Sequence, residues 1–179
     1  NSRRLWLLVV FSLLVSSFES FIVTKHGPPR KNSRVVLSNN MSPEEARKLG
    51  LFRRTPLIRS EPLSNLANTD VYLKLDNLQD SGSFKDRGMG HLILELSQSG
   101  IRKIMTSSGG NAGLAAATVA HKLNLDCTVV VPETTKPIVI AKLQSLGATV
   151  IVHGKNWNAA DAFVQSQLDD PTIAYVPPY

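Results

Sequence analysis

The sequence predicts an α/β fold, in which a parallel, twisted sheet is flanked by helices on both faces. From residue 71 onward, short runs of mostly apolar, β-rich residues alternate with longer segments of helical pattern. Helices of about ten or more residues between successive strands are typical of βαβ units, whose strands run parallel. No internal repeat of about 20 to 50 residues and no low-complexity tract interrupts this alternation. At 179 residues, the chain is expected to hold one domain or pieces of two.

The individual elements follow from the apolar runs and the residues that bound them. A short helix is expected first, because Ser42 is a hydroxyl N-cap, Pro43 suits the first helical position and Glu45 stands at N3. It should run to Leu49 and stop at Gly50. Strands are expected at residues 71–75, 103–106, 127–131, 149–153 and 173–175. Longer helices are expected at about residues 84–99, 111–122, 137–146 and 157–168, the first closed by Gly100 and the third by Gly147.

The net positive charge of the chain comes from its N-terminal third. Residues 1–54 hold ten Lys and Arg against three Asp and Glu, which leaves ten basic and eleven acidic residues in 55–179. Without a basic stripe on the folded body, a nucleic-acid partner is disfavoured. The single cysteine, Cys127, excludes an internal disulfide and is expected to be a small buried core residue.

The N-terminal segment is expected to be a leader. In residues 1–20, Arg3 and Arg4 precede an apolar stretch from Leu5 to Ser17, which is shorter than the roughly 20 residues needed to span a bilayer. A cleavable signal peptide fits this pattern, so contact with a membrane is expected only through the leader. Residues 21–41 are basic and contain no acid, as in a transit peptide or a flexible linker. We therefore expect a secretory route or a two-part leader to an organelle such as a plastid, and a soluble mature protein.

The first loop with chemical potential is Ser81-Gly-Ser-Phe-Lys-Asp-Arg-Gly88. Small residues follow a strand there and open a helix, which places Lys85 near a helix N-terminus. The helix dipole and the exposed amides disfavour a cation at this position. A lysine held as a neutral amine can condense with an aldehyde to a Schiff base. An ordinary surface lysine is the alternative.

The second loop is Thr106-Ser-Ser-Gly-Gly-Asn-Ala-Gly113, which follows a strand and opens an alanine-rich helix. Glycines let the backbone turn tightly, and the free amides of the helix start point beyond the carboxyl end of the strand. A small carboxylate or phosphate would fit there, and Asn111 could add a hydrogen bond. A plain glycine-rich turn is the alternative.

Taken together, the two loops resemble those of fold-type II pyridoxal-phosphate enzymes, the tryptophan synthase β-like superfamily. Five further segments agree with the family in order: Thr55-Pro-Leu57, Val71 to Asp76, Val130 to Thr135, Leu146 to Val150 and Tyr175 to Pro178. The resemblance covers residues 55–179 and is closest to the animal-type L-serine/threonine dehydratases, because the loop reads Asn111-Ala112-Gly113. Racemases of the family carry a serine where this chain has Gly109, and Gly109 has no proton to give.

The resemblance implies pyridoxal 5'-phosphate as cofactor and a role for each residue of the two loops. Lys85 would hold the cofactor as a Schiff base and remove the α-proton of the substrate. Phe84 would contact the cofactor ring, and Asn111 would hydrogen-bond its 3-hydroxyl group. The substrate carboxylate would be held by Ser108, Gly109, Gly110, Asn111 and Ala112. No metal ligands are assigned.

The implied reaction is α,β-elimination from a small amino acid. Serine would give pyruvate and ammonia, and threonine would give 2-oxobutanoate. A β-replacement enzyme similar to cysteine synthase is one alternative. A threonine synthase is another, because Lys85-Asp-Arg-Gly88 is also seen in that group. A non-catalytic relic or interaction protein is the third.

The resemblance also implies a division into domains. Residues 42–95 would be part of the large cofactor domain, and residues 96–179 the small domain, truncated before the chain returns to the large one. The phosphate-binding loop and the partner of the pyridine nitrogen would follow later, so we expect a fragment that is inactive alone and a homodimer at full length. Apolar surface is expected on Leu73 and Leu75.

Overall fold

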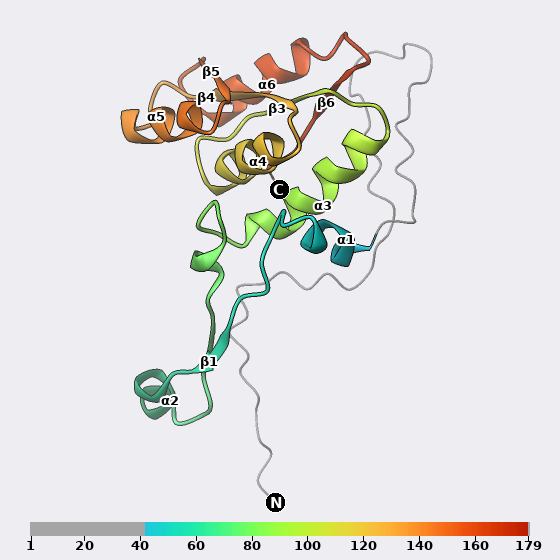
Figure 1. Ribbon diagram of the computed structural model, residues 1–179. Helices are drawn as coiled ribbons and strands as arrows, with labels where there is room; N and C mark the ends of the chain where they lie inside the picture. The colour runs from blue at the N-terminus through green and yellow to red at the C-terminus, as the bar shows by residue number, and fades with distance from the viewer. Residues whose placement is uncertain (1–41, 179) are drawn as a thin grey trace, which may run out of the picture.

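The computed structural model describes residues 42–178 and contains a four-stranded parallel sheet (Figure 1). The strands are β3 (Lys103–Thr106), β4 (Asp126–Val131), β5 (Thr149–Val152) and β6 (Ile173–Tyr175), and the sheet order is β5-β4-β3-β6. All three strand pairs are parallel. The predicted α/β fold is confirmed, while the expected leader segments 1–20 and 21–41 lie outside the described residues.

Helices cover both faces of this sheet. They are α3 (Lys85–Gln98), α4 (Asn111–Lys122), α5 (Pro137–Ser145) and α6 (Trp157–Ser166). On one face, α4 and α5 bury a large core that includes Ile104, Val129 and Leu143, and α3 packs against α4. On the other face, α6 buries a smaller core around Met105, Val130 and Val164. The central strands β3 and β4 are therefore buried on both sides, which explains the apolar residues on both of their faces, whereas the edge strand β5 is partly exposed.

The predicted boundaries of these elements are nearly those observed. The strand β4 begins one residue earlier than predicted, β5 ends one residue earlier, and α6 ends at Ser166 instead of Leu168. Gly100 and Gly147 follow the ends of α3 and α5 and have positive φ angles, which is the conformation of glycines that terminate helices. Cys127 is buried, and burial raises the pKa of its thiol to about 12.

The first helix also forms as predicted. It is α1 (Pro43–Lys48), and the Glu45 carboxylate accepts the Ser42 N–H at 2.9 Å. Gly50 follows with a φ of 71° and ends the helix. Within residues 42–178, no helix is both long and apolar enough to cross a bilayer.

One prediction about the sheet is wrong. The strand at 71–75 exists as β2 (Tyr72–Lys74), but it pairs antiparallel with β1 (Leu57–Arg59) in a separate two-stranded sheet. The short helix α2 (Glu61–Ala67) joins the two strands, and both strands are exposed along their whole length. Both strands face solvent, so the pair is not buried between helices as the strands of a parallel sheet are. The sequence pattern missed β1 and α2 because three-residue strands and a seven-residue helix show no clear period.

The expected apolar exposure holds for Leu73 but not for Leu75. Leu73 is 37% exposed, and Leu57 and Leu66 of the same hairpin are 62% and 85% exposed. Leu75 is half-buried at the end of the hairpin, where its N–H donates to the carbonyl of Pro56 at 3.0 Å before the chain turns into the short 3-10 helix η1 (Asp76–Leu78).

Candidate active site

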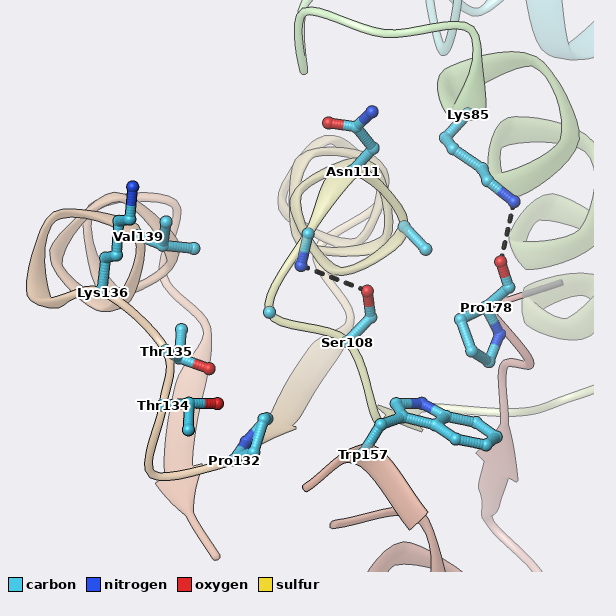
Figure 2. Close-up of a pocket in the computed structure, with 13 residues that line it drawn as sticks. Lys85, Ser108, Asn111, Pro132, Thr134, Thr135, Lys136, Val139, Trp157 and Pro178 are labelled. Carbon is cyan, nitrogen blue, oxygen red and sulfur yellow. Dashed lines mark hydrogen bonds between the residues drawn. The ribbon is translucent and has the colours of Figure 1, made fainter. Parts of the chain in front are cut away.

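An open cleft of about 590 Å³ lies at the carboxyl ends of the parallel strands. Its size falls within the usual range for small-molecule sites, and this edge of an open α/β sheet is where such ligands bind. The residues that line it come from α3, from the loops after β3, β4 and β6, and from the starts of α4, α5 and α6 (Figure 2): Lys85, Ser108, Gly109, Gly110, Asn111, Ala112, Pro132, Thr134, Thr135, Lys136, Val139, Trp157 and Pro178. Six of the seven residues assigned from the sequence are among them.

Lys85 is the first residue of α3 and reaches the cleft from one side (Figure 2). Its Nζ atom donates a hydrogen bond of 2.7 Å to the carbonyl oxygen of Pro178, 93 positions along the chain. Phe84, the seventh assigned residue, does not line the cleft, but the Lys85 Nζ atom lies 5.5 Å from the centroid of its ring. The Lys85 amine is therefore held at the cleft by the loop after β6.

The second loop presents free backbone donors to the same cleft. Gly110 is the N-cap of α4 and provides no side-chain cap, and the first helical hydrogen bond runs from the Leu114 N–H to the Gly110 carbonyl. The preceding N–H groups at the helix start are thus available to an anion. The Ser108 hydroxyl accepts the Gly110 N–H at 3.3 Å and tightens the turn.

Gly113 allows this loop to fold back on its own helix. A Cβ atom at this position would lie 1.9 Å from the carbonyl oxygen of Ser108, so no residue with a side chain fits there. Gly113 therefore belongs to the construction of the anion loop, although sequence reasoning assigned it no role.

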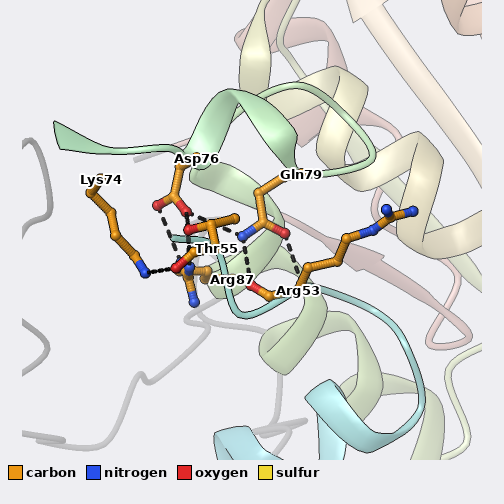
Figure 3. A network of polar contacts seen from close by, with 6 residues as sticks. All are labelled: Arg53, Thr55, Lys74, Asp76, Gln79 and Arg87. Atoms are coloured by element: carbon orange, nitrogen blue, oxygen red, sulfur yellow. Dashed lines mark hydrogen bonds and ion pairs between the residues drawn. The ribbon is translucent and has the colours of Figure 1, made fainter. Parts of the chain in front are cut away.

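A polar network anchors the segment that carries Lys85 (Figure 3). The carboxylate of Asp76 accepts hydrogen bonds from Arg87 at 2.8 and 3.2 Å and from the Thr55 hydroxyl at 2.6 Å. Gln79 pairs with the backbone of Arg53, donating to its carbonyl at 2.9 Å and accepting its N–H at 2.8 Å. Because Arg87 lies two residues beyond Lys85, these contacts fix the start of α3 against the Arg53–Thr55 segment.

The surroundings of Asp76 and Asp86 shift the pKa values of these two carboxyl groups in opposite directions. Burial alone would raise the pKa of Asp76, but the hydrogen bonds from Arg87, Thr55 and Gln79 outweigh it and lower the pKa to about 2. Next to Lys85, the fully buried Asp86 accepts the Ser81 N–H at 3.0 Å, and burial raises the pKa of its carboxyl group. This hydrogen bond joins the two ends of the loop Ser81–Lys85.

A second network supports the anion loop from the far side of the sheet. Asp161 on α6 accepts hydrogen bonds from the Ser107 hydroxyl at 2.5 Å and from the Tyr175 hydroxyl at 2.6 Å. The indole N–H of Trp157 donates to the Ser107 carbonyl at 2.6 Å. Burial and the bond to Asp161 together raise the pKa of Tyr175 to about 12. Ser107 is thus bonded to Asp161 and Trp157 of α6, and Asp161 links it further to Tyr175 of β6.

Sequence reasoning missed the wall formed by the loop after β4, which contributes Thr134, Thr135 and Lys136. A usable signal was present, because β4 is parallel to β3 and its carboxyl end reaches the same edge of the sheet. Trp157 was missed as well, since its contact with Ser107 joins residues 50 positions apart.

The chain is similar in sequence and in fold to known proteins. A family model described as pyridoxal-phosphate dependent enzyme matches residues 48–179. The chain is 47% identical over 123 residues to the L-serine dehydratase of Saccharomyces cerevisiae, covering 65% of the chain and 36% of that protein. It is 45% identical over 125 residues to the serine dehydratase-like protein of Homo sapiens, covering 70% and 38%. The crystal structure of the L-serine ammonia-lyase from Rhizomucor miehei matches with a TM-score of 0.66 and 32% identity, covering 72% and 41%. The chain therefore spans less than half the length of these relatives.

Proposed function

Because the chain belongs to the family of pyridoxal-phosphate-dependent enzymes, we propose that the complete protein is an L-serine ammonia-lyase, with L-threonine as a second substrate. The proposal rests on one observation: the Lys85 amine and the N-terminus of α4, which has no side-chain cap, line the same cleft. Similarity to the yeast L-serine dehydratase, the human serine dehydratase-like protein and the fungal L-serine ammonia-lyase supports elimination from serine as the reaction. The cysteine synthase-like, threonine synthase and relic alternatives are the competing proposals.

The described residues fit the cofactor in the part of the site that they form. Lys85 would attach the aldehyde group as a Schiff base, because its amine lies at the cleft and is held only by a neutral carbonyl oxygen. Asn111, exposed at the start of α4, would hydrogen-bond the ring hydroxyl group. Phe84 would contact the ring from the edge of the site, next to the Lys85 amine.

When bound, pyridoxal phosphate supplies an electron sink for the bond that breaks at the α-carbon. Around it, Ser108 and the amides from Gly109 to Ala112 would bind the substrate carboxylate and so fix the orientation of the α-carbon. Lys85, freed as an amine once the substrate is bound, would accept the α-proton. The β-hydroxyl group would leave as water, and addition of one water molecule to the resulting imine would then release ammonia and leave pyruvate from serine.

The proposal is tested with the complete gene product, loaded with pyridoxal phosphate and supplied with L-serine or L-threonine. We expect release of pyruvate and of 2-oxobutanoate, with serine preferred. A parallel assay with an activated serine and sulfide measures formation of cysteine. Cysteine formation without pyruvate release would favour the β-replacement alternative, and a protein that binds no cofactor would favour the relic.

A further inference from the structure

Gly109 faces Thr135 across the wall of the cleft. Gly109 belongs to the loop between β3 and α4, and Thr135 to the loop between β4 and α5. A Cβ atom built on Gly109 would lie 2.8 Å from Oγ1 and 3.0 Å from Cγ2 of Thr135. The φ angle of Gly109 is not in the left-handed region. Space, and not backbone conformation, therefore restricts this position to glycine.

Rotation of Thr135 cannot relieve this crowding. The Oγ1 and Cγ2 atoms of Thr135 both lie beside the Cβ atom built on Gly109. Two of the three staggered positions on the Thr135 Cβ atom therefore face Gly109. Threonine has heavy atoms at two of the three positions, and every rotamer leaves at least one of them facing Gly109. Valine has the same property. Serine has a single heavy atom on Cβ and can turn it away.

The crowded space lies on the side of the loop away from Lys85. Figure 2 shows Lys85 and Thr135 on opposite sides of the loop, with Asn111 between them. A side chain at position 109 would point toward Thr135 and thus away from the Lys85 amine. Lys136, the other lysine of the cleft, is exposed, and its side chain runs away from Thr135 in the same view.

We propose that Thr135 determines the reaction specificity of the site, because it closes position 109 to any side chain that could carry a proton. Removal and return of the α-proton then both fall to Lys85, on one side of the substrate. Inversion at the α-carbon would need a second donor on the other side, and a hydroxyl at position 109 would supply it. This inference rests on the proposed function, and it assigns to the loop after β4 a role in choosing elimination over racemisation.

The steric part is tested on the cofactor-free complete gene product by thermal unfolding. Gly109→Ser is made alone and together with Thr135→Ser or Thr135→Val, and each is compared with its own parent. We expect a drop in the unfolding midpoint of roughly 5 °C in the wild-type and Thr135→Val backgrounds. In the Thr135→Ser background the drop should be less than half as large. An equal drop in all three backgrounds would overturn the pairing.

The chemical part is tested on the same variants after loading with pyridoxal phosphate. Gly109→Ser with Thr135→Ser should form D-serine from L-serine roughly tenfold faster than Thr135→Ser alone. If the double variant folds and binds cofactor without this gain, the specificity role of Thr135 is wrong. Failure of the proposed function is distinguished from this result, because the wild type would then release no pyruvate, while the unfolding experiment would still report on the pairing.

Discussion

The position of Lys85 in the cleft is established by the structure and could not be read from the residue alone. In the sequence it is a lysine in a small-residue loop, and its amine could equally face solvent. In the structure it shares a cleft with the loop Ser108–Ala112 and bonds to Pro178. The residues that hold it in place, Asp76 and Arg87, were not predicted, since their contact depends on how the chain turns between them.

Asp76 also provides a prediction about pH. Its pKa is about 2 in the folded protein and about 4 in an unfolded chain, so the unfolded state takes up the proton first as the pH falls. Its charge therefore stabilises the fold above about pH 4 by roughly 2 kcal/mol, and this contribution is lost as the pH falls toward 2. Asp76→Asn, which mimics the protonated form, should lower the free energy of unfolding at pH 7 and match the wild type near pH 2.

Denaturant unfolding between pH 7 and pH 2 measures this difference. Asp169→Asn is the matched control, because Asp169 is exposed and should show little effect at any pH. A difference between wild type and Asp76→Asn that stays constant with pH would contradict the role of the charge.

At the scale of elements, predictability followed the length and burial of each segment. The strands β3, β4, β5 and β6 are rich in apolar residues and are separated by helices of nine residues or more, so their positions could be read from the sequence. The pair β1 and β2 could not, because each strand has three residues and is exposed. Likewise, nothing in the pattern of α6 shows that Asp161 would reach Ser107 on a neighbouring element.

Asp161 connects α6 to the anion loop, so its removal should loosen that loop. Asp161→Ala removes the acceptor shared by Ser107 and Tyr175, and loosening of the loop should raise the KM for serine roughly tenfold. Asp161→Asn keeps an oxygen acceptor at the same place and should restore most of the affinity.

Steady-state kinetics of serine elimination separate these variants from a general loss of structure. Asn158→Ala, an exposed position on the same helix, is the matched control. If Asp161→Ala changes kcat but leaves KM as in the wild type, or if Asp161→Asn is equally damaging, the loop is not positioned by this carboxylate.

At the scale of the whole molecule, the described chain is a parallel α/β unit with an exposed antiparallel hairpin beside it. The fold and the cofactor family could be predicted because ordered motifs extend from Thr55 to Pro178. The wall formed by Thr134 to Lys136 could not, because its contribution depends on how adjacent strands align at their ends. The division at residue 95, the homodimer and the leader remain predictions.

Chemical trapping of the cofactor shows whether it is bound by Lys85. The complete gene product is loaded with pyridoxal phosphate, reduced with borohydride and digested, and the pyridoxyl group is located by mass spectrometry. Lys142, exposed on α5, provides the matched control through Lys142→Ala beside Lys85→Ala. We predict that the label lies on Lys85, persists in Lys142→Ala and disappears in Lys85→Ala. A label on another lysine, or an undiminished label in Lys85→Ala, would show that Lys85 does not bind the cofactor.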